Sequence, residues 1–361
     1  MTNRFNPMTQ LNHTCWSRLF WFPSILYGCG MRIRNALYRL GLIKIHNLNA
    51  FVISVGNITI GGTGKTPLVI YLAQWLAKQQ LTVAVLSRGY KRKSKNALMV
   101  SDGKGRLASA LTGGDEPFLI ARRAKQAAVY VGSNRVKTAR MYTQKSCDII
   151  ILDDGFQHLR ISRDINIVCM NANNPWGNSR TIPAGWLREP LSGLNRADFI
   201  VRMHSGKISA EKNQIKNIQK WTSAPVIEAR RTPKDWIQLG TDKPLPLNHL
   251  HNKKVLAFAG IANPDSFKET LAAINIEPDC FLPFMDHHWY SEKDLGKIIN
   301  TAEQQQSDVI ITTEKDAVRV PAGFFGSVPI YFLRIEIQIE NADILLKSIS
   351  SKNRRRLNKG S

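Results

Sequence analysis

The feature that most constrains the fold of this chain is the glycine-rich segment Gly61-Gly-Thr-Gly-Lys-Thr66. The apolar run 51–56 before it is typical of a buried strand. Beyond it, apolar residues recur at helical spacing, at Leu68, Leu72, Trp75 and Leu76. A glycine-rich loop between a strand and a helix directs its backbone N–H groups inward, and the helix N-terminus adds a positive dipole end. The segment therefore predicts a binding site for a nucleoside triphosphate.

Each position of this loop has an expected role. Lys65 is expected to reach the outer phosphates, and the hydroxyl of Thr66 is expected to bind Mg²⁺. The usual pattern begins with a glycine five residues before Gly64, and this chain has Thr59 there. The predicted nucleotide-binding residues are Gly61, Gly62, Thr63, Gly64, Lys65 and Thr66.

The charge of the chain is unusual for a soluble protein. Fifty Lys and Arg against 27 Asp and Glu leave a formal net charge of +23, whereas the apolar content of 43% is ordinary. Such an excess favours an anionic partner, which could be nucleic acid, an acidic membrane surface or a phosphorylated substrate. The five cysteines form no CxxC pair, and Cys147 and Cys169, which lie at or within apolar strand-like runs, are expected to be reduced core residues.

Both ends of the chain carry distinctive segments. Residues 19–28 are apolar and aromatic, but they are too few to span a bilayer and Pro23 interrupts them. Arginines flank them at 18, 32, 34 and 39, a pattern that favours a segment lying in the interface of an anionic membrane. The alternative is a helix packed on the protein's own core. The basic stretch 352–359 is expected to be a disordered tail.

Strand and helix patterns alternate along the chain, which predicts a parallel sheet covered on both faces. Further strands are expected at 82–86, 127–132, 147–152, 165–170, 198–203 and 226–230. After a polar, proline-containing stretch at 232–252, strands are expected at 255–260, 308–312 and 329–333, with a helix at 264–274.

We therefore expect an α/β fold of the P-loop NTPase type, with a parallel sheet flanked by helices. A second, smaller α/β domain and an N-terminal membrane-associated helix complete the expected architecture. The expected parts are an interfacial segment at 1–45, a P-loop kinase domain at 46–235, a smaller domain at 236–345 and a basic tail at 346–361.

Paired carboxylates follow the strand at 147–152. Asp153 and Asp154 leave its carboxyl end, where they would lie beside the phosphate loop if the two strands are neighbours. In nucleotide-binding proteins with such a loop, an acidic residue at this place holds the Mg²⁺ that bridges the outer phosphates. By themselves Asp-Asp-Gly residues often form a simple turn. Combined with the loop, they predict a magnesium site, and Gln157 and His158 follow directly.

Two other polar clusters leave alternatives open. Asp115 and Glu116 stand at an expected helix start, where they are either favourable acids at an N-terminus or a general base for a substrate hydroxyl. The Asp286-His-His288 cluster is either a surface turn or a source of a carboxylate–histidine pair assembled between domains. The element that recognises guanine has the pattern Asn/Thr-Lys-x-Asp, with one residue between the lysine and the aspartate. In Glu314-Lys-Asp316 the lysine directly precedes the aspartate, so binding of GTP is not inferred.

Eight short motifs occur in one order along the chain, at 55–67, 87–90, 114–117, 152–158, 183–190, 260–264, 286–288 and 313–316. Together these motifs resemble the tetraacyldisaccharide 4′-kinase family of lipid A biosynthesis. The resemblance covers residues from about 15 to about 340, and Thr59 fits the family's own form of the loop.

The resemblance implies transfer of the γ-phosphoryl group of ATP to the 4′-hydroxyl of tetraacyldisaccharide 1-phosphate. It implies ATP and Mg²⁺ as cofactors, with Thr66 and Asp153 or Asp154 around the ion. Asp115 resembles the family's general base, His287 rather than His288 its supporting histidine, and Lys65 a catalytic phosphate-binding residue. The residues expected near phosphate or sugar are Arg88, His158 and Arg188.

The implied location is the cytoplasmic face of the inner membrane, where the protein would be peripheral or monotopic. The expected partners are the anionic lipid A precursor and an anionic membrane surface, and no nucleic acid. The alternative function is a P-loop ATPase that serves as a switch or as a nucleic-acid-associated module, which would also explain the loop and the net charge of +23.

Overall fold

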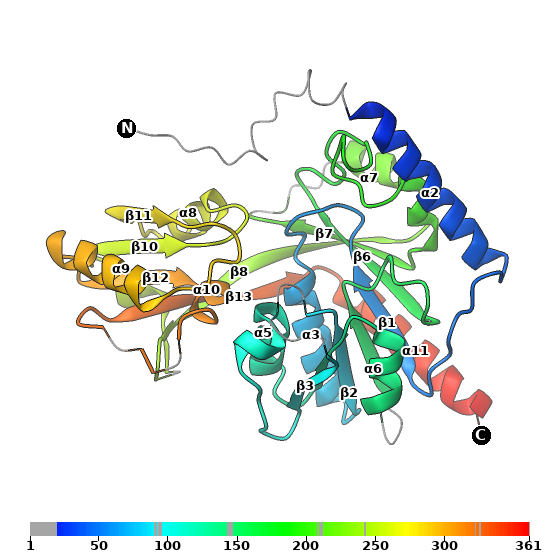
Figure 1. The fold of residues 1–361 in the computed structure, drawn as a ribbon, viewed down its shortest axis with the longest axis horizontal. Coiled ribbons are helices and arrows are strands. Elements are labelled where there is room, and N and C mark those ends of the chain that lie inside the picture. Colours follow the sequence, from blue (N-terminus) through cyan, green and yellow to red (C-terminus); the bar gives the residue numbers. More distant parts are fainter. Residues whose placement is uncertain are drawn as a thin grey trace.

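The fold is built on one large twisted sheet (Figure 1). Within the described residues, 13 strands form this sheet, in the order β11-β10-β12-β13-β8-β7-β6-β1-β5-β2-β4-β3, with β9 paired to β8. The computed structural model describes residues 20–89, 92, 96–142, 147–206, 208, 212–241, 243–321, 323–324 and 326–360. Arg18, Leu19 and Tyr90, which belong to sequence motifs above, lie outside these residues.

The first half of the sheet surrounds β1, which pairs in parallel with β5 on one side and β6 on the other. β3 at the far edge is antiparallel to β4, and the other neighbouring strands of this half are parallel. The strands are β1 (Phe51–Gly56), β2 (Val83–Ser87), β3 (Leu98–Asp102), β4 (Ala128–Val131), β5 (Ile149–Asp153), β6 (Ile165–Asn171) and β7 (Phe199–His204). The expected strands are present, and β3 is an addition to them.

Helices cover both faces of this half because its strands are apolar on both sides. One face packs against α3, α5 and α11, and the opposite face packs against α6 and α7. The helices are α3 (Lys65–Lys78), α4 (Ala110–Gly113), α5 (Asp115–Arg123), α6 (Arg135–Tyr142) and α7 (Lys212–Gln219), with the 3₁₀ helix η1 at Leu191–Arg196.

The second half is a smaller parallel array, β11-β10-β12-β13, with α8 on one face and α9 on the other. The expected strands and the helix at 264–274 are found here, whereas β11 and α9 were not expected. The elements are β9 (Pro244–Leu245), η2 (Leu247–Leu250), β10 (Val255–Ala259), α8 (Asp265–Ala272), β11 (Cys280–Pro283), α9 (Glu292–Gln304), β12 (Val309–Thr313), α10 (Glu314–Ala317) and β13 (Ile330–Ile339).

Two long strands join the halves (Figure 1). β8 (Val226–Gln238) pairs in parallel with β7 of the first half and antiparallel with β13 of the second. The stretch 232–252, which we expected to be a junction, therefore begins inside a strand. The division at 235/236 remains a prediction about independent folding units.

The N-terminal helix α2 (Trp21–Arg39) contacts the protein through polar side chains and exposes apolar ones, the reverse of the usual arrangement. Several of its polar side chains face the protein: Ser24 bonds to Thr181, Tyr27 to the carbonyl of Arg188, and Asn35 to Glu189. Five of its large apolar side chains are exposed, namely Trp21, Phe22, Ile25, Leu26 and Ile33. Among the helices that the structure describes, none has the length and apolar character needed to cross a bilayer.

The C-terminal prediction of a disordered basic tail is wrong. Residues Ala342–Gly360 form the helix α11, which packs Leu345 and Ile349 into the core of the first half. Lys352 pairs with Asp198 at 2.8 Å, and Arg356 pairs with Asp164 at 2.7 Å. The basic side chains are thus held by acidic partners on the sheet's own loops.

Candidate active site

The phosphate loop lies at the carboxyl end of β1. α3 begins at Lys65 after Gly64, whose φ of 80° lies in the left-handed region that glycine adopts without strain. A Cβ at Gly64 would lie 2.8 Å from Cγ of Met203, while Gly61 and Gly62 have open space around them. The loop therefore needs glycine at Gly64 for its shape and leaves room for a ligand at the other two.

The paired carboxylates lie beside this loop because β5 is the neighbour of β1, with Val55 opposite Asp153. Asp153 is buried and accepts a hydrogen bond from Oγ of Ser87. Burial, with the charges of Glu116 and Asp154, raises the pKa of Asp153 to about 6. A nearby cation would therefore stabilise the ionised form of the Asp153 carboxyl.

Asp154 has the opposite electrostatic environment. Its side chain pairs with Nζ of Lys65 at 3.3 Å and with Nη1 of Arg188 at 2.8 Å. Burial acts to raise its pKa, but the charges of Lys65 and Arg188 lower the pKa of Asp154 to about 2. Lys65 also donates to Oδ1 of Asn57 at 3.0 Å. Lys65, Asp154 and Arg188 thus form one charged group at the loop.

The donor set at this place fits Mg²⁺. The hydroxyl of Thr66 and the carboxylates of Asp153 and Asp154 are oxygen ligands of the kind that Mg²⁺ takes. No group of three His, Cys, Asp or Glu side chains within the described ranges forms a ready metal cage. In phosphoryl-transfer sites Mg²⁺ usually takes its remaining ligands from phosphates and water.

Asp115, at the first position of α5, is joined to the second half of the molecule. Its Oδ2 lies 2.7 Å from Nδ1 of His287 and 2.8 Å from Nε of Arg319. Burial acts to raise the pKa of Asp115, but the hydrogen bond from His287 and the charge of Arg319 hold this pKa well below its ordinary value. Asp115 is therefore an ionised acceptor.

The two histidines of the Asp286–His288 cluster have different partners. His287, with a φ of 63°, faces Asp115, whereas His288 stacks on Phe284 and lies 3.2 Å from Asp294 of α9. The carboxylate–histidine pair of the sequence hypothesis is thus formed by His287. Glu116 pairs with Lys315 at 2.6 Å.

The three residues expected near the substrate lie at the same edge of the first half. Arg88 is exposed directly after β2, and Arg188 bonds Asp154. His158 is largely buried, and its Nε2 has no hydrogen-bond partner among the described residues. Burial and the charges of Arg135 and Arg163 lower the pKa of His158 to about 3, so its imidazole is neutral.

Sequence reasoning missed three residues of this site. Arg319 was not singled out, and local spacing carries no signal for it because its partner is 204 positions away. Arg135 donates from Nη1 to the carbonyl of Asp154 at 2.9 Å, again without a local signal. Asn57 was recognisable, since it directly follows the strand that leads into the loop.

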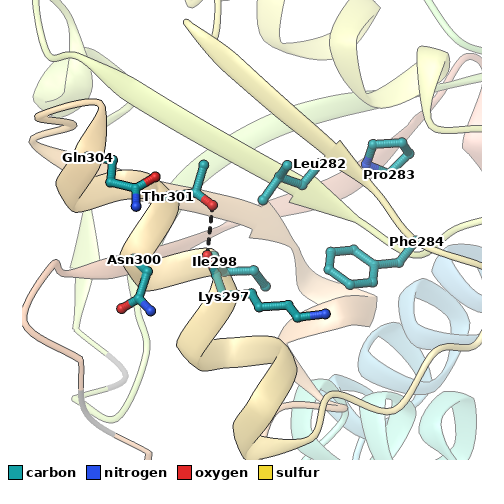
Figure 2. Close-up of a pocket in the computed structure, with 8 residues that line it drawn as sticks. All are labelled: Leu282, Pro283, Phe284, Lys297, Ile298, Asn300, Thr301 and Gln304. Atoms are coloured by element: carbon teal, nitrogen blue, oxygen red, sulfur yellow. Dashed lines mark hydrogen bonds between the residues drawn. The ribbon is translucent and has the colours of Figure 1, made fainter. Parts of the chain in front are cut away.

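A separate hollow lies between β11 and α9 at the outer edge of the second half (Figure 2). Leu282 and Phe284 point toward α9 there, and the hydroxyl of Thr301 donates to the carbonyl of Lys297 within the helix (Figure 2). β11 is the edge strand of the second half, whereas β1, which leads into the phosphate loop, lies in the first half. This hollow therefore belongs to a different part of the molecule.

The fold and the loop define the class of protein. A glycine-rich loop leads from a central parallel strand into a helix, and paired carboxylates end the neighbouring strand. This is the arrangement of a P-loop nucleoside-triphosphate-binding protein.

The comparisons with known proteins place the chain within that class. The family model of LpxK, tetraacyldisaccharide-1-P 4′-kinase, matches residues 16–353, so the chain belongs to this family. It is 41% identical over 345 residues to the tetraacyldisaccharide 4′-kinase of Halothermothrix orenii, with 90% of each chain covered. It is 40% identical over 328 residues to that of Syntrophus aciditrophicus, with 88% of each covered.

A solved structure has the same fold. The crystal structure of LpxK from Aquifex aeolicus in complex with ATP matches with a TM-score of 0.76 at 31% identity. The match covers 93% of this chain and 99% of the other. The expected fold class is confirmed.

Proposed function

We propose that this protein transfers the γ-phosphoryl group of ATP to the 4′-hydroxyl of tetraacyldisaccharide 1-phosphate. The observation that carries the proposal is the meeting of Asp115 and His287, from the two halves of the molecule, at the edge that bears the phosphate loop. Membership of the tetraacyldisaccharide 4′-kinase family supports this reaction over the ATPase switch or nucleic-acid module. No specific observation favours either alternative.

The loop is proposed to bind the triphosphate. Backbone N–H groups of the loop and the N-terminus of α3 would contact the phosphates, and Lys65 would move from Asp154 to the transferred group. Mg²⁺, held by Thr66 with Asp153 or Asp154, would supply neutralisation of the charge on the outer phosphates. Phosphoryl transfer depends mainly on such positioning and charge neutralisation.

Asp115 is proposed to accept the proton of the attacking hydroxyl. Both His287 and Arg319 contact Oδ2, whereas Oδ1 accepts a bond from the backbone N–H of Glu116. Oδ1 is the oxygen that we propose to face the substrate hydroxyl. As the bond from the 4′-oxygen to the γ-phosphorus forms and the bond to the β,γ-bridging oxygen breaks, the hydroxyl proton passes to Asp115 and ADP leaves.

A weakly basic carboxylate suits this reaction. In a loose phosphoryl-transfer transition state the hydroxyl keeps much of its proton, so the acceptor chiefly orients the nucleophile. Arg88 and Arg188 would contact anionic groups of the bound substrates. His158, kept neutral by its surroundings, would exchange hydrogen bonds with sugar hydroxyls instead.

The helix α2 is proposed to bring the enzyme to its lipid substrate. Its exposed apolar face would lie in the interface of an anionic membrane, on the cytoplasmic side, as a peripheral or monotopic contact. Its inner face bonds the carbonyls of Gln157 and Arg188, which adjoin the proposed substrate residues. A lipid headgroup at this helix would thus be next to the site.

The test is transfer of label from γ-labelled ATP to tetraacyldisaccharide 1-phosphate in detergent micelles, with and without Mg²⁺. We expect labelled lipid that depends on Mg²⁺ and is lost in Lys65→Ala. Lys268→Ala removes an exposed lysine of the second half and serves as the control. Hydrolysis of ATP without labelled lipid would contradict the kinase and favour the switch ATPase.

A further inference from the structure

The Thr313-Glu-Lys-Asp316 motif was left without a role by the sequence, and the structure gives it one. Thr313 caps the short helix α10 by accepting a hydrogen bond from the backbone N–H of Asp316. Charged side chains of α10 reach across to α5 of the first half. Glu314 pairs with Arg123 at 2.8 Å and Lys315 pairs with Glu116 at 2.6 Å.

Arg319, just beyond α10, makes the third of these contacts. It reaches Asp115 with two nitrogens, Nε at 2.8 Å and Nη2 at 2.6 Å, both on Oδ2. Nη2 also lies 3.4 Å from Nδ1 of His287. The side chain of Arg319 is 0% exposed, so this fork lies in a water-poor environment where its direction matters.

The second half holds the guanidinium of Arg319 rigidly. Its Nη1 donates to the carbonyl of Gly260 at 2.8 Å and contacts Oδ1 of Asp316 at 3.3 Å. Asp316 is itself fixed, since it accepts bonds from the backbone N–H of Gly260 and the hydroxyl of Tyr290. The orientation of the Arg319 guanidinium is therefore fixed by residues of the second half, in addition to its contact with Asp115.

From these contacts we infer that Arg319 is a positioning residue for Asp115: it fixes Oδ2 and so aims Oδ1 at the substrate hydroxyl. The inference rests on the proposed kinase function. Asp115 is the first residue of α5, and without Arg319 the rotation of its carboxylate would be limited by the contact with His287 and the bond from the backbone N–H of Glu116. A planar fork with two donors on one oxygen restricts that rotation, which a single ammonium group cannot do.

The experiment is a double-mutant cycle on labelled-phosphate transfer, with Arg319→Gln and Asp115→Asn singly and together. We expect Arg319→Gln to lower kcat by about 10–100-fold, the usual range for residues that orient a catalytic group. The KM for ATP should be unchanged, because the contacts of Arg319 in the described part of the chain are with Asp115, His287, Gly260 and Asp316 and not with the phosphate loop. In the Asp115→Asn background, Arg319→Gln should change kcat by less than about twofold, because both changes act through one carboxylate.

Two further variants make the result specific. Arg319→Lys keeps the charge but loses the fork, so we expect a smaller loss of kcat, still about tenfold. Arg140→Gln removes an arginine of α6, which covers the face of the sheet opposite α5, and its effect should be the same with Asp115 or with Asn at that position. If Arg319→Gln does not fold, as judged by thermal unfolding, the cycle is carried out with Arg319→Lys.

The inference is overturned by a wild-type kcat in Arg319→Lys, or by an equal loss from Arg319→Gln in both backgrounds. The second result would mean a purely structural role. Failure of the proposed function gives a different result, since the unmodified protein would then not label the lipid at all.

Discussion

Asp153 and Asp154 are neighbours in the chain, yet they have opposite environments. Asp153 continues β5 into the interior beside Ser87, while Asp154, with a φ of 50°, turns its side chain toward Lys65 and Arg188. The left-handed backbone at Asp154 is one that aspartate tolerates better than most residues. Asp153 is proposed to meet a cation, whereas Asp154 is already paired with cationic side chains.

Removal of the proposed base tests the assignment most directly. Asp115→Ala is expected to lower kcat by roughly 10²–10⁴-fold, the range for loss of general acid–base catalysis. Labelled-phosphate transfer measures the effect. Asp265→Ala, which removes an exposed aspartate at the start of α8, is the matched control. Near-wild-type turnover in Asp115→Ala would remove this residue from the mechanism.

His158 predicts a pH dependence of stability. Because burial lowers its pKa from 6.5 to about 3 in the folded protein, the unfolded chain binds a proton below about pH 6.5 that the folded chain does not. Its contribution to the free energy of unfolding therefore falls as the pH decreases through that range. His158→Gln has no such proton, so its unfolding temperature should fall less between about pH 7.5 and about pH 5. Parallel curves for the two proteins would contradict the buried, neutral imidazole.

At the scale of elements, α2 and α11 illustrate two uses of an amphipathic pattern. α11 turns Leu345 and Ile349 into the core and pairs its basic side chains with Asp164 and Asp198. α2 does the reverse, with polar side chains bonded to the protein and a row of apolar ones in solvent. Such a face is stable when it is covered by another apolar phase.

Membrane binding is therefore expected to depend on the outer face of α2. Burial of one large apolar side chain contributes about 1.5–3 kcal/mol, so Phe22→Glu or Leu26→Glu should weaken binding to acidic phospholipid vesicles about tenfold or more. Co-sedimentation measures the partition coefficient. Met141→Glu changes an exposed apolar residue on α6 and should bind as the unmodified protein does. Equal binding of Phe22→Glu and the unmodified protein would exclude α2 as the contact.

At the scale of the whole molecule, the site depends on how two halves of one sheet meet. β8 and β13 run through both halves (Figure 1). α10 holds α5 by ion pairs between side chains. Asp115, the proposed base, and its partners His287 and Arg319 thus come from opposite sides of this junction. Their alignment is a property of the complete chain.

The pair of Arg123 and Glu314 allows this alignment to be tested by stability. Both side chains are nearly buried, at 10% and 11% exposure, so Arg123→Ala should lower the free energy of unfolding by about 3–5 kcal/mol. Much of that loss is the uncompensated charge of Glu314, whose pKa is already raised by burial. Adding Glu314→Gln should therefore recover part of the loss in urea unfolding, whereas additive losses would show that the pair does not couple the halves.

Much of the fold could be predicted from local pattern. Apolar runs such as 149–153 and 165–171 identify strands, and glycine before Lys65 identifies the loop, because these features depend on neighbouring residues. α11 was missed because a run of basic residues is typical of a disordered segment, and the helically spaced Leu345 and Ile349 lie before that run. The extension of β8 through Thr232 and Pro233 was missed because polar residues are tolerated where antiparallel pairing with β13 supplies the hydrogen bonds.

The sequence by itself determined the nucleotide loop, the carboxylates that end β5, the α/β fold class and the family. Each of these depends on backbone geometry within a short segment or on several such segments in order. Only the tertiary structure decided which charges meet: His287 and Arg319 are 172 and 204 positions from Asp115. The physical reason is that burial and charge pairing depend on distances through space, and local periodicity carries no record of those distances.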